Sequence, residues 1–286
     1  MTMKPGTRLR AALLHPDIVV APGVFDAMSA LLATRAGFEA LFLSGSAVSY
    51  AQLARPDLGL VTMDELATIA THICERVDTP LMVDIDQGFG SVANVQRAVH
   101  AFERAGCAGV QIEDQIAVKP AATLQARPVV SLSDMLGKLR AAQDARRDKD
   151  FLISARTDAQ PFDEAFKRAV AFAEAGADMI FVECVRERAD AERLAKAIGA
   201  RVPLVSNFLE GRPHFARDAA DLQAMGFHIA LYPGVGIGSA VAAMESSFAK
   251  LAANGSNANL VRADAATINQ LVETERFVRD ATKYAG

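Results

Sequence analysis

Acidic residues stand where two neighbouring apolar runs of the sequence end. Asp84 and Asp86 end one run, and Glu113 ends the next. Residues two apart on a strand point the same way, so Asp84 and Asp86 are expected to face one side. Three carboxylates brought together repel unless a cation lies among them, and only oxygen ligands are available here. The residues predict Mg2+ as first choice and Mn2+ as second, with ion pairing to Arg156 and Lys119 as the alternative.

Polar residues recur at the end of nearly every predicted strand. The further members of this set are Ser44-Gly45-Ser46, Arg156, Glu183, Asn207 and Tyr232-Pro233. Buried carboxylates need partners, so this many in register favours a site over unrelated loop residues. Arg156 carries a planar fork suited to a substrate carboxylate. Ser44-Gly45-Ser46 offers backbone N–H groups where a ligand can approach closely. None of the five histidines falls in the set, so Ser–His–Asp chemistry has no obvious base.

These strand ends must be positioned by a repeated local pattern, in which a helical segment ends in Gly and a short apolar strand follows. Gly37, Gly106, Gly176 and Gly226 stand at such helix ends, where a left-handed conformation suits glycine. The expected strands lie near Ile18–Ala21, Ala40–Ser44, Leu81–Asp84, Gly109–Glu113, Phe151–Ala155, Met179–Glu183, Leu204–Asn207 and His228–Tyr232. The expected helices include Met63–Arg76, Val92–Ala105, Asp134–Arg147 (capped by Ser133), Asp163–Ala175 and Ala189–Ile198.

Eight strands that alternate with helices predict one α/β domain over residues 1–286, a (β/α)8 TIM-type barrel. A doubly wound open sheet gives the same alternation, but no GxGxxG follows the first strand. The segment 115–131 after the fourth strand is expected to form a lid over the active end. Ile237–Ala253 and Ala265–Tyr284 look helical, and the extension at about 255–286 exceeds what closing a barrel needs, so an oligomer contact is expected.

The bulk composition excludes several classes of function. Half of the chain is apolar (51%), and the net charge is −4, which argues against a nucleic-acid partner. No apolar run is long enough to predict a membrane span. The three cysteines, Cys74, Cys107 and Cys184, have no metal-ligand spacing and are expected to be reduced core residues of a cytoplasmic enzyme.

Several longer strings carry a family resemblance. They are PGVFDAMSA (22–30), LFLSGSAVS (41–49), PDLGL (56–60), DIDQGFG (84–90), GVQIEDQ (109–115), ISARTDA (153–159), FVE (181–183), NFLEG (207–211) and LYP (231–233). In this order through most of the chain, they resemble the isocitrate lyase and phosphoenolpyruvate mutase superfamily. DxDxGFG followed by IEDQ is highly specific, and the chain is identified as a member.

The resemblance implies a role for each of these residues. Asp84, Asp86 and Glu113 would hold Mg2+, largely through waters, and Asp57 would lie close to the metal and the reacting group. Ser44, Gly45 and Ser46 would bind the oxo-acid end of a small carboxylate substrate, with Arg156 bridging its charge. Glu183, Asn207, Tyr232 and Pro233 would line the far wall. The resemblance also implies a homotetramer in which C-terminal helices swap between subunits.

One departure from the family pattern narrows the activity. Isocitrate and methylisocitrate lyases carry a lid string resembling K-K/R-C-G-H, whose Cys delivers a proton. Here Lys119 persists, and with Asp57 and Arg156 it is a catalytic candidate, but Ala121 stands at the Cys and Thr123 at the His. A methyl group cannot transfer a proton, so those two lyase activities are not expected. The mutase-type Asn is not evident either.

The sequence therefore predicts a Mg-dependent carbon–carbon lyase that acts on a small 2-oxo or 2-hydroxy acid through a metal-stabilised enolate. Decarboxylation of an oxaloacetate-like acid fits. Retro-aldol cleavage of a substituted malate also fits, with Asp57 as one candidate base and Tyr50 or water as acid. The alternatives are C–P bond cleavage, as in phosphonopyruvate hydrolase, and a ligand-binding barrel without catalysis. The substrate's substituents and the proton donor stay open.

Overall fold

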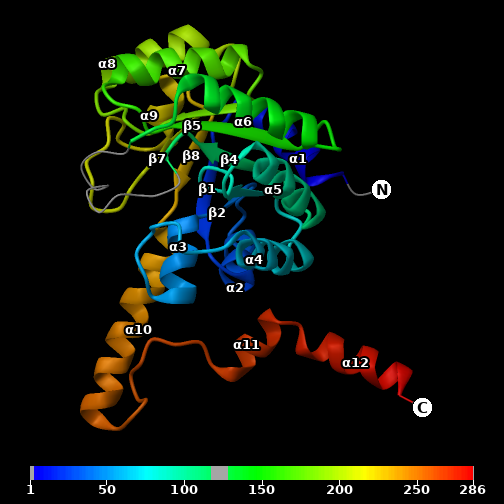
Figure 1. Cartoon of the computed structure of the whole chain (residues 1–286). Coiled ribbons are helices and arrows are strands. Elements are labelled where there is room, and N and C mark those ends of the chain that lie inside the picture. The colour runs from blue at the N-terminus through cyan, green and yellow to red at the C-terminus, as the bar shows by residue number, and fades with distance from the viewer. Residues whose placement is uncertain (1–2, 117–127, 286) are drawn as a thin grey trace. The chain divides into compact units, whose positions relative to one another are not determined.

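The computed structural model describes residues 3–116 and 128–285 of the chain (Figure 1). Its contacts divide the chain into two compact units, Met1–Ile237 and Gly238–Gly286. The first unit holds every strand and every strand-end residue discussed above. The site is therefore built within one unit.

The first unit is a closed barrel of eight parallel strands in chain order, as the sequence predicts. The strands are β1 (Val19–Val24), β2 (Leu41–Leu43), β3 (Leu81–Asp84), β4 (Gly109–Glu113), β5 (Leu152–Thr157), β6 (Met179–Val182), β7 (Leu204–Asn207) and β8 (Ile229–Tyr232). β8 returns to β1 with Val19 opposite Ile229, which closes the sheet. Parallel strands need crossover helices, and closure brings the carboxyl ends of all eight strands to one rim.

Helices connect the strands and cover the outside of the barrel (Figure 1). They are α2 (Ala27–Arg35), α3 (Gly45–Val48), α4 (Met63–Arg76), α5 (Val92–Arg104), α6 (Leu132–Ala145), α7 (Phe162–Glu174), α8 (Arg188–Leu194) and α9 (Ala219–Ala224), with two short π-helices, η1 (Ser49–Leu53) and η2 (Ala195–Gly199). Two expectations were wrong in detail. The cap of α6 is Ser131 and not Ser133, because the Ser131 hydroxyl accepts the Asp134 N–H. The helix expected over 189–198 changes to a π-helix at Ala195.

In four of the helix-to-strand connections a glycine lies just after the end of the helix, as the repeated pattern predicts. Gly37, Gly106, Gly176 and Gly226 have φ angles of 92°, 90°, 80° and 94°. The left-handed conformation is unfavourable in energy for residues with a Cβ, but glycine adopts it without this strain. The backbone can therefore turn sharply from each helix into the next buried strand.

The amino-terminal end of the barrel is filled by α1 (Pro5–Leu13), which brings Leu9 against the first residues of the strands. Leu9 is fully buried and packs with Val19, Met82, Leu152 and other interior residues. Complete burial of a leucine side chain contributes about 1.5–3 kcal/mol. The packed end leaves the opposite rim as the place for polar residues.

The second unit is helical. The helix α10 (Val235–Asn254) continues into it from the barrel, and α11 (Ala265–Leu271) and α12 (Thr274–Tyr284) follow. The single helix expected over Ala265–Tyr284 is interrupted, because Glu273 adopts a left-handed φ of 59°. Among the described helices, none combines the length and the apolarity that a membrane crossing requires.

Candidate metal and substrate site

Asp84, Asp86 and Glu113 meet at the carboxyl-terminal rim. One ligand oxygen from each lies within 4.8 Å of the others. Asp84 and Asp86 do not converge through the alternation of side chains along a strand, as the sequence predicted. β3 ends at Asp84, and Asp86 has a left-handed φ of 48°. The Asp86 N–H donates to Asp84 Oδ1 at 3.2 Å, and the Glu113 N–H donates to the Asp86 carbonyl at 2.9 Å. A tight turn, tied to β4, therefore brings the carboxylates together.

Glu113 is the buried member of this trio, with 2% of its surface exposed. Burial, opposed by Arg156, raises the pKa of Glu113 well above its usual range, and Asp158, Asp84 and Asp86 raise it further. Its Oε1 atom accepts no hydrogen bond from the described residues. A buried acceptor with no partner is costly, and a cation would satisfy it. The oxygen-only donor set therefore fits a hard divalent cation.

Arg156 lies beside the trio but holds a carboxylate of its own chain. Its Nε and Nη2 atoms donate to the two oxygens of Asp158, both at 2.9 Å. Its Nε also lies 3.4 Å from Glu113 Oε2, and its Nη2 lies 3.7 Å from Glu183 Oε2. Burial alone would lower the pKa of Arg156, but the nearby carboxylates of Asp158, Glu113 and Glu183 outweigh burial and raise this pKa. Sequence reasoning missed Asp158 as the residue that orients this fork.

Asp57 and the segment after β2 form another wall of the site. Asp57, Asp84 and Asp86 line one small cavity with Gly45 and Ser49. Gly45 lies next to Asp84, since an added Cβ would make van der Waals contact with Asp84 Oδ2 at 3.8 Å. The structure thus places Asp57 beside two of the trio's carboxylates.

The Ser44-Gly45-Ser46 segment begins α3. The Ser44 side chain is buried, accepts the Ala47 N–H at 3.4 Å and lies 3.0 Å from the Ser46 hydroxyl. Helix amino-termini carry unpaired N–H groups and attract anions. Tyr50 follows in η1 and is 48% exposed.

The expected far wall is aromatic as well as polar. Asn207 donates through Nδ2 to Glu183 Oε2 at 3.4 Å. Phe208 stacks on Tyr232 with ring centroids 4.9 Å apart and planes at 8°. Pro233 lies against β1, since an added Cβ on Gly23 would meet the Pro233 carbonyl at 1.9 Å. The four predicted wall residues therefore lie at the ends of three adjacent strands: Asn207 and Tyr232 end β7 and β8, and Glu183 and Pro233 directly follow β6 and β8.

His214 joins this wall, although no sequence signal placed it there. Its ring lies 4.1 Å from Phe208 and 4.1 Å from Phe215. Its Nδ1 lies 2.9 Å from the Ala216 N–H and 3.1 Å from the Ala216 carbonyl, and its Nε2 lies 3.0 Å from the Ser206 hydroxyl. Burial lowers the pKa of His214. A neutral ring in this setting supports the wall through packing.

Lys119, with Ala121 and Thr123, lies outside the described residues. The ends of the expected lid are described, and they are joined. Gln115 and Val129 form an antiparallel bridge, and the Ile116 N–H donates to the Pro128 carbonyl at 3.0 Å.

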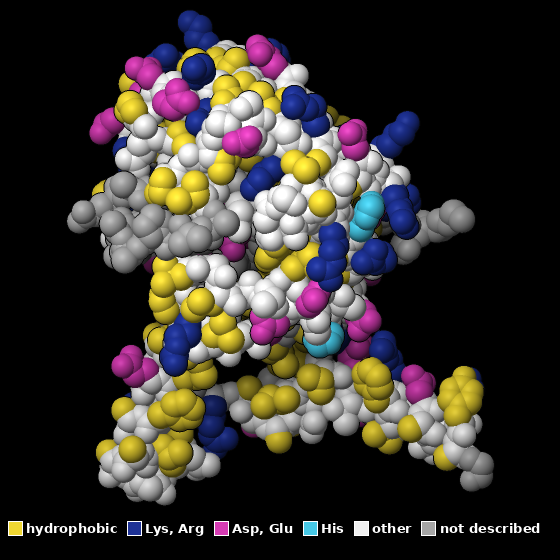
Figure 2. All heavy atoms as spheres, in the orientation of Figure 1, with side chains coloured by type: hydrophobic (Ala, Val, Ile, Leu, Met, Phe, Trp, Pro, Cys, Tyr) yellow, Lys and Arg dark blue, Asp and Glu magenta, His cyan; other side chains and the backbone are white. Residues whose placement is uncertain are grey.

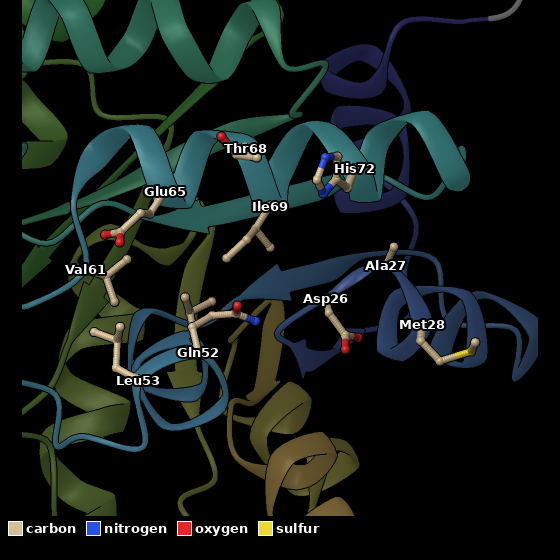
Figure 3. A pocket seen from close by; sticks show the side chains of 11 residues that line it. Asp26, Ala27, Met28, Gln52, Leu53, Val61, Glu65, Thr68, Ile69 and His72 are labelled. Carbon is tan, nitrogen blue, oxygen red and sulfur yellow. The ribbon is translucent and has the colours of Figure 1, made fainter.

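A separate pocket lies on the outside of the barrel between α2, η1 and α4 (Figure 3). Its carboxylates are engaged in helix caps: Asp26 accepts the Ser29 N–H at 2.7 Å, and Glu65 accepts the Thr62 N–H at 2.8 Å. Val61 lines both this pocket and the small cavity beside Asp84 and Asp86, so the two are neighbours. Because the carboxylates of the outer pocket are engaged in caps, the chemistry is expected at the rim and not in this pocket.

The closed barrel and its acidic rim define an α/β-barrel protein with a candidate divalent-cation site. The family model described as phosphoenolpyruvate phosphomutase matches residues 9–252. The chain belongs to this family, and the resemblance seen in its motifs is confirmed.

Two curated relatives are lyases. The chain is 39% identical to 2,3-dimethylmalate lyase of Eubacterium barkeri over 245 residues, which cover 85% of this chain and 84% of the relative. It is 41% identical to 2-methylisocitrate lyase of Aeropyrum pernix over 263 residues, which cover 90% and 83%. A crystal structure of 2,3-dimethylmalate lyase superposes with a TM-score of 0.91 at 30% identity, covering 100% of this chain and 97% of the other.

Proposed function

We propose that the protein is a Mg-dependent carbon–carbon lyase that cleaves a small alkyl-substituted 2-hydroxy dicarboxylic acid. One observation carries the proposal. Asp84, Asp86 and Glu113 bring ligand oxygens within 4.8 Å of one another, with the Arg156 guanidinium 3.4 Å from Glu113. This arrangement offers a divalent cation and a fixed positive charge to the two carboxylates of such a substrate.

The three carboxylates would hold the cation, and Mn2+ would be its closest substitute. When bound, the cation would be chelated by oxygens of the substrate and would supply positive charge that stabilises negative charge developing on the substrate oxygen. Arg156 would pair with a substrate carboxylate, and the N–H groups at Ser44–Ser46 would orient the 2-hydroxy acid end. Glu183, Asn207 and the Tyr232-Pro233 turn would confine the rest of the molecule.

Asp57 is proposed as the base. It would take the proton of the substrate's 2-hydroxyl, whose oxygen becomes the carbonyl of a 2-oxo acid as the bond between C2 and C3 breaks. The bonding electrons pass to C3, and the resulting enolate of the second acid takes a proton from water or from the exposed Tyr50 hydroxyl. No lid thiol is required, which agrees with Ala121 at the position of the family's Cys. Lys119 is proposed to contribute charge from the same segment.

The aromatic wall supports an alkyl-bearing substrate over a tricarboxylate. Phe208, which follows Asn207 in the chain, stacks on Tyr232, and these rings would offer carbon surface to an alkyl group; 2,3-dimethylmalate lyase is among the similar proteins. Decarboxylation of an oxaloacetate-like acid uses the same half of the site and is the second candidate. It needs the cation and Arg156, but no base at a hydroxyl.

The test is a panel of 2,3-dimethylmalate, 2-methylmalate and oxaloacetate in Mg2+, each repeated in EDTA, with Asp84→Ala as the matched inactive variant. The expected products are a 2-oxo acid and a second carboxylic acid. Pyruvate with CO2 would assign decarboxylation instead. If no acid is consumed in a metal-dependent way, the lyase proposal fails.

We further propose that the protein is a homotetramer that exchanges helices of the second unit between subunits. Large apolar side chains are exposed along α10, namely Val241, Met244, Phe248 and Leu251. Neither α11 nor α12 has a buried residue, and Figure 2 shows hydrophobic side chains on the surface of these helices. Exposed apolar surface of this kind marks an interface. Light scattering after gel filtration should give four times the chain mass.

A cytoplasmic location is proposed on the cysteines, which are all free thiols in the structure. Thiols that stay reduced are typical of that compartment. Cell fractionation tests the location.

A further inference from the structure

Asp114 directly follows the metal candidate Glu113, but the proposed reaction does not use it. Its side chain is fully buried. One carboxylate oxygen accepts the Thr157 hydroxyl at 2.7 Å and Arg168 Nη1 at 3.1 Å, and the other accepts the Asp158 N–H at 2.9 Å. The described partners of its carboxylate belong to β5, to the residue that follows β5, or to α7.

Asp114 is connected to Arg156 through its backbone and through Asp158. The Asp114 N–H donates to the Arg156 carbonyl at 3.1 Å, so Asp114 holds the backbone on both sides of Thr157. Asp158, whose N–H is held in this way, accepts two 2.9 Å hydrogen bonds from the Arg156 guanidinium. The orientation of the fork therefore depends on Asp158, and the position of Asp158 depends on Asp114.

Arg168 makes the buried charge of Asp114 tolerable. Its side chain is 8% exposed and also contacts Glu164 Oε1 at 2.9 Å and the Val130 carbonyl at 3.0 Å. Burial raises the pKa of Asp114, but the Asp158 N–H, the Thr157 hydroxyl and Arg168 oppose that rise. A buried carboxylate that loses such partners destabilises the fold, so Asp114, Thr157 and Arg168 act as a unit.

A comparable cluster lies at the amino-terminal end of the barrel, and its described hydrogen bonds do not reach Arg156, Asp158 or the three rim carboxylates. Asp178, which precedes β6, accepts Arg10 Nη2 at 2.6 Å, Arg146 Nη1 at 2.6 Å and the Ile153 N–H at 2.9 Å. Like Asp114, Asp178 is a carboxylate that accepts hydrogen bonds from arginine and from one backbone N–H. The two clusters differ in what they hold in place, which makes Asp178 a matched control.

We infer that Asp114, held by Arg168 and Thr157, is a positioning residue that fixes Asp158 and, through it, the Arg156 guanidinium beside Glu113. The inference rests on the proposed function, because it takes Arg156 to contact a substrate carboxylate. Replacing the hydrogen-bond partners of metal-ligating residues changes metal affinity or activity about 10–100-fold, and an effect of the same order is expected for a residue that orients Arg156. The effect should appear in the binding of a carboxylate ligand and not only in stability.

The probe is oxalate in the presence of Mg2+, titrated by calorimetry into the full-length protein. Oxalate has the planar pair of oxygens found in the enolate of a 2-oxo acid. Asp114→Asn should raise the Kd for oxalate about 10–100-fold. Asp178→Asn should lower thermal stability but leave the Kd within about twofold. Equal oxalate affinities for Asp114→Asn and wild type would overturn the inference, as would equal losses in the two variants.

Milder variants cover the case in which Asp114→Asn does not fold. Arg168→Lys keeps the charge but loses the fork, whereas Arg168→Met loses both, so the Kd should rise in that order. Thr157→Val should raise the Kd by itself, because it removes a hydrogen bond to Asp114. A crystal structure of a folded variant, in which Arg156 keeps its contacts with Asp158 and Glu113, would contradict the positioning role.

The outcomes separate this inference from the proposed function. If wild type binds oxalate and the variants bind it weakly, but no acid in the panel is consumed, the lyase proposal fails and the positioning role stands. If turnover is found, kcat/KM should fall mainly through KM in the Arg168 variants. If wild type does not bind oxalate in Mg2+, Arg156 does not receive such a ligand and the inference is wrong.

Discussion

Glu113→Gln is predicted to stabilise the metal-free protein while weakening its response to Mg2+. Glu113 lies within 4.8 Å of the Asp84 and Asp86 carboxylates and 3.4 Å from Arg156. With an effective dielectric constant of about 20, each repulsion is worth about 3.5 kcal/mol and the attraction about 5 kcal/mol. For the ionised form of Glu113 the repulsion therefore exceeds the attraction by about 2 kcal/mol before the cost of burying the charge is counted, in agreement with its raised pKa. The neutral amide is nearly the same size and removes this excess.

The assay is thermal unfolding in EDTA and again in Mg2+. In EDTA, a gain of about 1–2 kcal/mol should raise Tm by about 2–8 °C in a chain of this size. Mg2+ at about 100 times its Kd should stabilise wild type by about 2.7 kcal/mol, or roughly 5–10 °C. The variant should show less than half of that shift, because it has lost an anionic ligand.

Glu103→Gln is the control, since Glu103 accepts the Arg147 N–H at 3.0 Å far from the rim. It should leave the Mg2+ shift unchanged. A Glu113→Gln protein that is less stable than wild type in EDTA, or that keeps the whole Mg2+ shift, would refute the idea that the trio is repulsive without a cation.

Three further predictions follow from the site and its wall. Asp57→Asn should lower kcat about 10²–10⁴-fold and keep the Mg2+ shift in Tm, because Asp57 is assigned to proton transfer; loss of that shift would make it a ligand. EDTA should abolish turnover and added Mg2+ should restore it, so activity that survives chelation would exclude the metal role. Burial lowers the pKa values of His214 and His228 below the ordinary value of 6.5. Just below pH 6.5 the unfolded chain therefore binds more protons than the folded chain. The free energy of unfolding should fall as the pH drops from 6.5 through the folded pKa values. His214→Gln should reduce this slope in urea titrations, and an unchanged slope would show that His214 does not contribute.

Much of the barrel could be predicted because its signals are local. The bounds of β3, β4, β7 and α4 agree with the sequence-based expectation. An apolar run followed at once by a carboxylate marks both a buried strand and its exposed end, and glycine marks the turn before it. Since parallel strands in a barrel end at one rim, the convergence of Asp84, Asp86 and Glu113 followed from their order alone.

The site beyond the trio depended on contacts that the local pattern does not encode. Arg156 was expected to face a substrate, but its fork is held by Asp158 two residues later. His214 lies in a loop between strands, and only the folded chain stacks it on Phe208. Short-range helix ends were also missed, because Ser131 and Ser133 are both suitable caps and the path of the chain into α6 selects Ser131.

The sequence by itself determined the barrel, the family and the acidic rim, because strand periodicity, glycine turns and carboxylate positions are properties of neighbouring residues. Only the tertiary structure decided how the charges are paired. Asp114 and Arg168 are far apart in sequence and carry no local signal, yet closure of the barrel places them 3.1 Å apart in a buried cluster. The energy of a buried charge depends on partners from distant elements, so its role appears only once the chain is folded.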